Sequence, residues 1–169
     1  MSIVVCRLPK AGLGNHLYPL MNALVFGRLN NLPVIIIGYH HLKIGPYLRK
    51  EKIKRKYNGY FTFQKNIIGE TIDRARVYLY AKRFETMKEP PVEKIAGPVP
   101  SNKLYLFEKL PTYHNYFIHL KGHRELVKEL LYSVINPAIL AEVEKLPKPV
   151  IGVHIRMGDF RKLKQGEDF

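Results

Sequence analysis

The sequence contains a single cysteine, Cys6, among its 169 residues, so no internal disulfide can form. This scarcity fits a reducing compartment, and the apolar run around Cys6 favours a buried, unreactive thiol. No apolar run approaches the roughly 20 residues that a membrane-spanning helix requires. The initial run Met1–Cys6 is too short for the core of a signal peptide. We therefore expect a cytoplasmic protein.

Candidate nucleophiles and metal ligands are also scarce. The serines are Ser2, Ser101 and Ser133. None of them lies in the sequence context of a nucleophile elbow, which argues against a serine hydrolase. His40 and His41 are adjacent and cannot both face one ion from a regular strand. His119 and His123 are four residues apart, but no acidic residue or cysteine nearby completes a site. We expect neither a bound metal nor another cofactor.

Acidic residues are few relative to basic ones, with 14 against 28, and the net charge is +14. Such a field attracts phosphates, nucleic acids and anionic membrane surfaces. The basic run Arg49–Lys56, with Tyr47, Tyr57 and Tyr60 nearby, would suit stacking on bases, although charge runs more often lie on solvated faces. Peripheral contact with an anionic membrane is compatible with this charge. A specific nucleic-acid partner is not expected.

The first part of the chain has the pattern of a βαβ unit. Ile3–Val5 and Val34–Ile37 are β-branched runs typical of buried strands, and Gly38 ends the second one. A glycine loop follows the first strand, and Asn30 and Asn31 are placed to end the helix between them. The apolar face of that helix consists of Leu17, Leu20, Met21, Leu24, Val25 and Leu29. The order predicts an α/β fold, a Rossmann-like parallel sheet with flanking helices.

The middle of the chain is less regular. We expect an exposed insertion over Lys43–Lys56, a short strand over Tyr60–Phe63, a helix over Ile72–Met87 and a proline-rich loop over Lys88–Ser101. The residues of the helix expected to face inward are Ile72, Ala75, Leu79 and Phe84.

The last third is regular again. Leu104–Phe107 suggests a strand, and Arg124–Val134 has one apolar helical face. Asn136-Pro137 has the pattern of a helix N-cap followed by proline at the first helical position. Val150–Ile155 is predicted to be a strand, and Arg156–Asp159 the turn at its carboxyl end, where ligands bind in open α/β sheets.

Two candidate sites follow strands. In the first, Gly12 and Gly14 allow a tight turn, and the next helix offers free N–H groups, with Asn15 and His16 beside them. This pattern is neither a dinucleotide fingerprint nor a Walker loop, and a simple strand-to-helix turn explains it equally well.

The second candidate site is His154–Asp159. Strand alternation places His154 and Arg156 on one face, and the Arg156 fork matches phosphate oxygens. Gly158 permits a crowded turn, and Asp159 can orient Arg156. A surface Arg-Asp pair that closes a turn is the alternative interpretation.

The two stretches together resemble the α-1,2-fucosyltransferase family. Its amino-terminal Gly-Gly-Leu-Gly-Asn-Gln-Leu/Met-Phe motif resembles Ala11-Gly12-Leu13-Gly14-Asn15-His16-Leu17-Tyr18. Its Val-His-x-Arg-Arg-Gly-Asp-Tyr motif resembles Val153-His154-Ile155-Arg156-Met157-Gly158-Asp159-Phe160. Tyr116-Phe117 and the helix through Leu131 resemble the segment between them, so the resemblance spans nearly the whole chain. Met157 stands where the family has its second arginine.

The resemblance implies the amino-terminal half of a GT-B glycosyltransferase that transfers L-fucose from GDP-fucose to a galactoside hydroxyl, without an obligatory metal. Residues 1–149 would form the acceptor-side half, and 150–169 would begin the nucleotide-sugar half. His154, Arg156, Gly158 and Asp159 would bind the donor diphosphate. Gly12, Gly14, Asn15 and His16 would line the cleft from the other half.

In that family a second half follows the His154–Asp159 motif, so the resemblance also implies a shortened chain with half of a donor site. A non-catalytic sugar-nucleotide or glycan-binding remnant is therefore the alternative function. A basic nucleic-acid-binding protein ranks below both, because charge explains neither motif. The sequence assigns no catalytic base, acceptor or oligomeric state.

Overall fold

The computed structural model describes residues 1–40, 48, 59–110 and 117–147. The chain divides into two compact units, residues 1–137 and 138–169. The second unit includes most of helix α5 (Pro137–Glu144), which begins at the proline where the sequence predicts a helix start. The strand predicted over Val150–Ile155, the boundary predicted after residue 149 and nearly all of the insertion predicted over Lys43–Lys56 lie outside the described residues.

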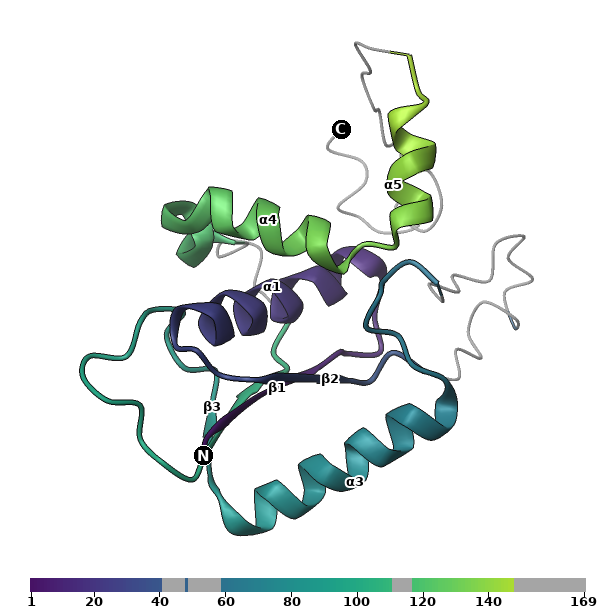
Figure 1. The fold of residues 1–169 in the computed structure, drawn as a ribbon. Helices are drawn as coiled ribbons and strands as arrows, with labels where there is room; N and C mark the ends of the chain where they lie inside the picture. The colour runs from purple at the N-terminus through teal and green to yellow at the C-terminus, as the bar shows by residue number, and fades with distance from the viewer. Residues whose placement is uncertain (41–47, 49–58, 111–116, 148–169) are drawn as a thin grey trace, which may run out of the picture. The chain divides into compact units, whose positions relative to one another are not determined.

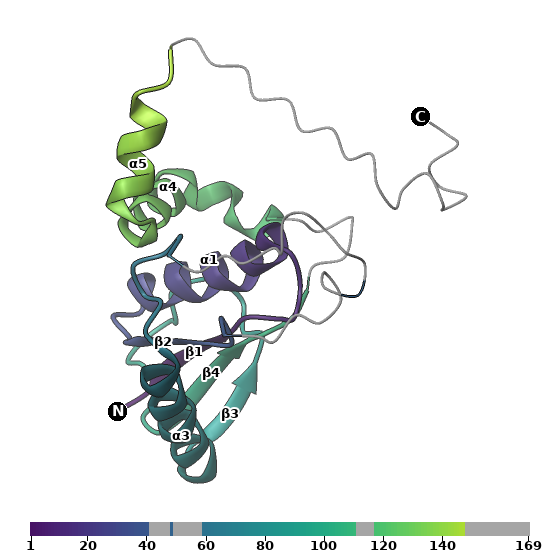
Figure 2. The same ribbon diagram turned by 90° about the vertical axis from the view of Figure 1, so that its right-hand side faces the viewer.

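The first unit is built on a four-stranded sheet whose described strands are all parallel, in the order β2-β1-β4-β3. The strands are β1 (Ile3–Arg7), β2 (Val34–Ile37), β3 (Glu85–Lys88) and β4 (Lys103–Phe107). In the central strand, Val4 pairs with Val34 on one side and Tyr105 on the other. Figure 2 shows the twisted sheet between its helices. This arrangement confirms the predicted Rossmann-like α/β fold.

Helices cover both faces of the sheet (Figure 1). Helix α1 (Leu13–Leu29) packs on one face, and α4 (Arg124–Val134), which follows the 3-10 helix η2 (Ile118–His123), packs on α1. Helix α3 (Ile67–Arg83) covers the other face. One apolar cluster therefore fills the space between β1, β4, α1 and α4, and a second lies between the sheet and α3.

Helix α1 is buried around most of its circumference, because it lies between the sheet and α4. Gly27 allows close contact with the start of β2: a Cβ there would lie 2.5 Å from Val34 Cγ2. The helix ends at Leu29 with Asn30 as its C-cap, as predicted. It begins at Leu13, earlier than predicted, so Gly14 lies in its first turn and not in a loop.

Helix α3 differs from the prediction in its bounds and in its inward face. Asn66 Oδ1 accepts a hydrogen bond from Gly69 N at 2.8 Å, which starts the helix at Ile67. The chain leaves the helix at Arg83 and forms β3 where the prediction continued the helix to Met87. The strand predicted over Tyr60–Phe63 is an isolated bridge between Phe61 and Ile135.

The inward residues of α3 are Glu70, Asp73 and Val77, and the predicted Ile72, Ala75 and Leu79 are exposed. Phe84 is half-buried and does pack against the second cluster. The two carboxylates can face inward because each has cationic or N–H partners. Lys65 Nζ lies 2.6 Å from Asp73 Oδ2, for example.

Glu70 joins α3 to the turn that follows β2. Its carboxylate accepts hydrogen bonds from Gly38 N at 2.7 Å and His40 N at 2.9 Å, and Arg74 donates to it from one turn along the helix. Burial alone would raise the pKa of Glu70, but the hydrogen bonds and the Arg74 charge outweigh burial and lower this pKa. The ionised carboxylate therefore stabilises the turn.

Candidate functional site

A cleft of about 670 Å³ opens at the carboxyl ends of β3 and β4, beside α1 and η2. This volume lies within the range of roughly 300–1,000 Å³ that is usual for small-molecule sites. The position also suits ligand binding, since open α/β sheets bind ligands outside the carboxyl ends of their strands. The cleft is lined by Tyr18, Asn22, Glu89, Pro90, Pro91, Val92, Glu93, Phe107, Lys109, Leu110, His119, Gly122 and His123.

Glu89 lines the cleft and is the first residue after β3. Its N–H donates to the carbonyl of Leu106 at 2.8 Å, and its Oε1 accepts from Glu108 N at 2.6 Å and Lys109 N at 2.7 Å. Glu89 has a φ of 47°, which is uncommon for a residue other than glycine. One side chain therefore fixes the paths of the chain after both β3 and β4.

Asn30 holds the far end of the proline-rich segment that follows β3 and forms one wall of the cleft. Its Nδ2 donates to the carbonyls of Phe26 and Glu93, and its Oδ1 accepts from Ile95 N at 2.7 Å. Val92 lies between the two fixed points and is buried in the core. The proline-rich wall is thus held in place by side-chain hydrogen bonds and apolar packing.

Asn22 gives the cleft an acceptor without a partner. The residue is 3% exposed, projects from the third turn of α1 and lines the cleft. Within the described part of the chain, its Oδ1 is the buried side-chain polar atom that has no hydrogen-bond partner. Leaving a buried acceptor unpaired costs about 1–3 kcal/mol. Because this oxygen is buried, a ligand hydroxyl or N–H in the cleft would pair with it only after the Asn22 side chain turns toward the cleft.

Two imidazoles and a phenol lie along the same cleft. The hydroxyl of Tyr18 and Nε2 of His119 are 3.0 Å apart, and the ring of Phe117 lies 5.6 Å from that of Tyr18. His123 is the N-cap of α4. Imidazole is the side chain best suited to exchange a proton near neutral pH. The cleft therefore combines an unpaired acceptor with two groups that are capable of proton transfer.

The glycine-loop residues predicted as a site lie at the start of α1 and are not among the residues that line this cleft. Gly12 has an ordinary extended backbone, with φ −74° and ψ 168°. A Cβ at Gly14 would have nothing within 4 Å. Asn15 is half-buried. His16 is buried, and its Nε2 lies 2.9 Å from the carbonyl oxygen of Pro9. Their role in a donor cleft stays a prediction.

The predicted diphosphate site, His154, Arg156, Gly158 and Asp159, lies outside the described residues.

The single thiol of the chain lies among the described residues. Cys6 is fully buried, and burial, aided by the charge of Glu89, raises the pKa of the Cys6 thiol far above its ordinary value. It is the buried, unreactive cysteine that the sequence predicted.

The sequence pattern did not reveal this cleft. Tyr18 and Asn22 lie one turn apart on α1, but long stretches of chain separate them from Glu89 and Lys109, and each is an ordinary surface or core residue in its local context. The four-residue spacing of His119 and His123 is the available signal, and in the sequence that spacing resembles a metal-binding pattern. Over the described residues, no group of three histidine, cysteine or acidic side chains is placed to hold a metal ion.

Comparison with protein families, with curated proteins and with solved structures finds no match to this chain. Among the helices that the structure describes, none is long and apolar enough to cross a membrane.

Proposed function

We propose that this chain is the acceptor-side half of a glycosyltransferase of the α-1,2-fucosyltransferase type, and that the cleft beside Asn22 binds the acceptor sugar. The observation that carries the proposal is the unpaired, buried Oδ1 of Asn22, a residue that lines a cleft at the carboxyl edge of a parallel sheet. A ligand that donates a hydrogen bond would satisfy this oxygen. Sugar hydroxyls are donors of this kind.

The other residues of the cleft suit a pyranose ring. Pro91 and Leu110 supply exposed apolar surface, while Lys109 and His123 supply polar groups at other positions along its lining. Sites for small molecules commonly combine an apolar lining with a few placed polar groups that fix orientation. A sugar has both an apolar C–H face and hydroxyl edges, so it can use both kinds of contact.

The donor half of the proposal depends on the motif similarity. Arg156, with His154, Gly158 and Asp159, would bind the diphosphate of GDP-fucose. In the transfer step, an acceptor hydroxyl oxygen forms a bond to C1 of fucose. The bond from C1 to the diphosphate oxygen breaks, and GDP leaves with the electron pair. The hydroxyl proton passes to a base. His119 and His123 are the candidates for this base in the described cleft.

The test measures binding of GDP-fucose by calorimetry, and transfer of fucose to a galactoside by chromatography of the products. We expect the full chain to bind GDP-fucose and Arg156→Ala to weaken that binding by about tenfold or more, the cost of a charge-assisted contact. Arg161→Ala, which removes a nearby positive charge outside the motif, is the matched control.

Each outcome decides one part of the proposal. Binding with transfer supports the enzyme. Binding without transfer assigns the chain to the non-catalytic sugar-nucleotide remnant. Equal affinity of Arg156→Ala and the unmodified chain would remove Arg156 from the site. If neither GDP-fucose nor a galactoside binds, the proposal is wrong.

A further inference from the structure

Helix α3 has a second apolar face that points away from the sheet. Ile68, Ile72, Ala75 and Leu79 are spaced by four, three and four residues, so they form one stripe along the helix. The isoleucines are 71% and 55% exposed and Leu79 is 54% exposed. Single exposed apolar residues are common, but a contiguous stripe of them marks a surface that binds something.

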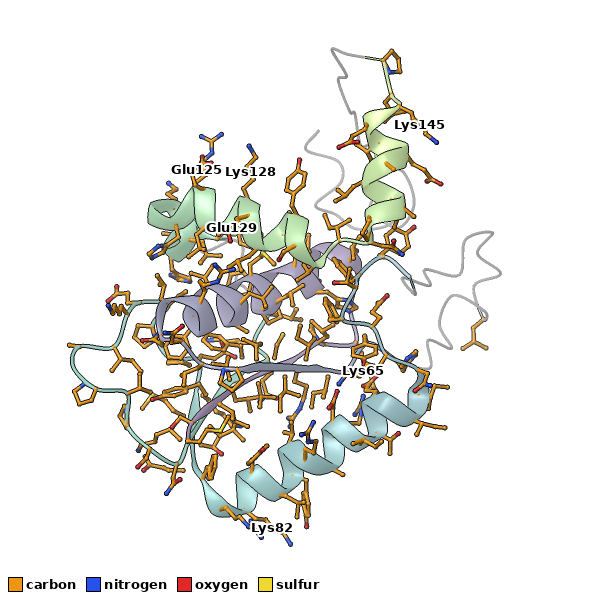
Figure 3. The ribbon with its side chains drawn as sticks, viewed as in Figure 1. Lys65, Lys82, Glu125, Lys128, Glu129 and Lys145 are labelled. Carbon is orange, nitrogen blue, oxygen red and sulfur yellow. The ribbon has the colours of Figure 1, made fainter. Side chains whose placement is uncertain are left out.

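The exposed charged residues of α3 beside the stripe are basic, although Arg76 Nη1 also lies 3.7 Å from Asp73 Oδ1. Arg76, Lys82 and Arg83 are exposed beside it, and Lys82 points away from the sheet (Figure 3). Lys82 Nζ also lies 4.6 Å from the ring centre of the exposed Tyr78. The acidic residues of α3, Glu70 and Asp73, are both buried on the opposite side. The outer face is therefore apolar along its centre and cationic at its border.

We propose that this outer face of α3, defined by Ile68, Ile72, Ala75 and Leu79 with Arg76, Lys82 and Arg83, binds the surface of an anionic lipid bilayer. Helices of this type lie in the plane of the interface, with their apolar side chains at the acyl boundary and their lysines and arginines among the lipid phosphates. The 17 residues of α3 give a contact about 25 Å long.

Charge selects the bilayer over a second copy of the chain. Two copies that met through this stripe would bring cationic borders to the same interface, and like charges across an interface disfavour association. The net charge of +14 adds to that repulsion. An anionic bilayer instead gains from each basic residue, and Tyr78 can occupy the headgroup level as interfacial aromatics do. This inference is independent of the proposed sugar site.

The test is flotation of the full chain with vesicles of phosphatidylcholine alone or mixed with phosphatidylglycerol. We expect binding to the mixed vesicles only, and weaker binding at high salt because salt screens the charges. The double variant Ile72→Ser/Leu79→Ser should lower affinity by about tenfold or more. Tyr132→Ser, which removes an exposed apolar side chain from α4, is the control. Circular dichroism verifies that each variant folds.

The absence of tryptophan from the chain provides a second measurement. Ile72→Trp should show a blue-shifted emission with anionic vesicles and quenching by a lipid-borne quencher, whereas Tyr132→Trp should show neither. Unchanged emission of Ile72→Trp overturns the proposal. So does equal binding by the double variant, or a concentration-dependent dimer that the double variant abolishes, since the stripe would then bind a second copy.

Discussion

Asn22 and Asn30 are both buried along α1, but their side-chain oxygens are in different situations. Asn30 Oδ1 accepts from Ile95 N, and its amide donates to two carbonyls. Asn22 Oδ1 has no partner among the described residues. Replacing an unpaired buried polar group with an apolar one of similar shape is neutral or stabilising, whereas removing a paired one leaves its partners unsatisfied. The same substitution at the two positions should therefore have opposite effects.

We expect Asn22→Leu to leave the free energy of unfolding unchanged or to raise it by about 1 kcal/mol, because it removes an unsatisfied acceptor. Asn30→Leu should lower it by about 2–3 kcal/mol, because Ile95 N and the carbonyl of Glu93 lose their partner. Urea unfolding measures both values. A loss of 2 kcal/mol or so at Asn22 would mean that its amide is structural, and would weaken its assignment to a ligand site.

Glu70 should make stability depend on pH. Its pKa is lowered in the folded chain, so its contribution is present above the ordinary glutamate pKa and is lost as pH falls through the folded value. At pH 7, Glu70→Gln should lower the free energy of unfolding by about 1–3 kcal/mol. The difference in free energy of unfolding between Glu70→Gln and the unmodified chain should shrink as the pH is lowered.

The control for Glu70 is Glu129→Gln. Glu129 pairs with Arg28 at 3.1 Å, and both side chains are more than half exposed, so its loss should change stability by less than about 1 kcal/mol. Thermal unfolding between neutral and acidic pH compares the two variants. If the stability difference between Glu70→Gln and the unmodified chain stays constant with pH, Glu70 is not the ionised, hydrogen-bonded carboxylate described above.

At the scale of elements, the predictable parts are those in which local pattern and burial agree. The β-branched runs Ile3–Val5 and Val34–Ile37 became β1 and β2, and α4 has the predicted bounds. Strand β3 was not predicted, because its sequence, Glu85–Lys88, is exposed at the sheet edge and has no apolar run.

The inward face of α3 could not be predicted from sequence for a physical reason. The helix has an apolar stripe on its outer face that is longer than the one facing the sheet. The inward positions of Glu70 and Asp73 are stable only because Lys65, Arg74 and the turn after β2 supply partners. Such tertiary contacts leave no periodic signal in the sequence.

The segment after β3 should depend on Glu89. Glu89→Ala removes the acceptor of Glu108 N and Lys109 N, so we expect a loss of about 1–3 kcal/mol and faster hydrogen exchange at those two amides. Glu93→Ala removes an exposed carboxylate from the same segment and should change neither. Unchanged exchange in Glu89→Ala would show that the cleft wall is held by other contacts.

At the scale of the whole molecule, the described part of the chain accounts for one half of the proposed site. The α/β scaffold was predictable, and it places a cleft at the expected edge of the sheet. The residues of that cleft come from α1, the segment after β3, the exit of β4 and η2. The first sequence motif lies at the start of α1, and the second falls in residues outside the described ranges.

The most direct test of the account is an NMR titration of the isotope-labelled chain with a methyl galactoside. We expect saturable shifts at the side-chain amide of Asn22 and at the backbone amides of Val92 and Gly122, with Ile72 on α3 unaffected. The same titration of Asn22→Leu should give affinity lower by about tenfold or more. No shifts in the cleft, or equal affinity in Asn22→Leu, would contradict the assignment of the cleft as an acceptor-sugar site.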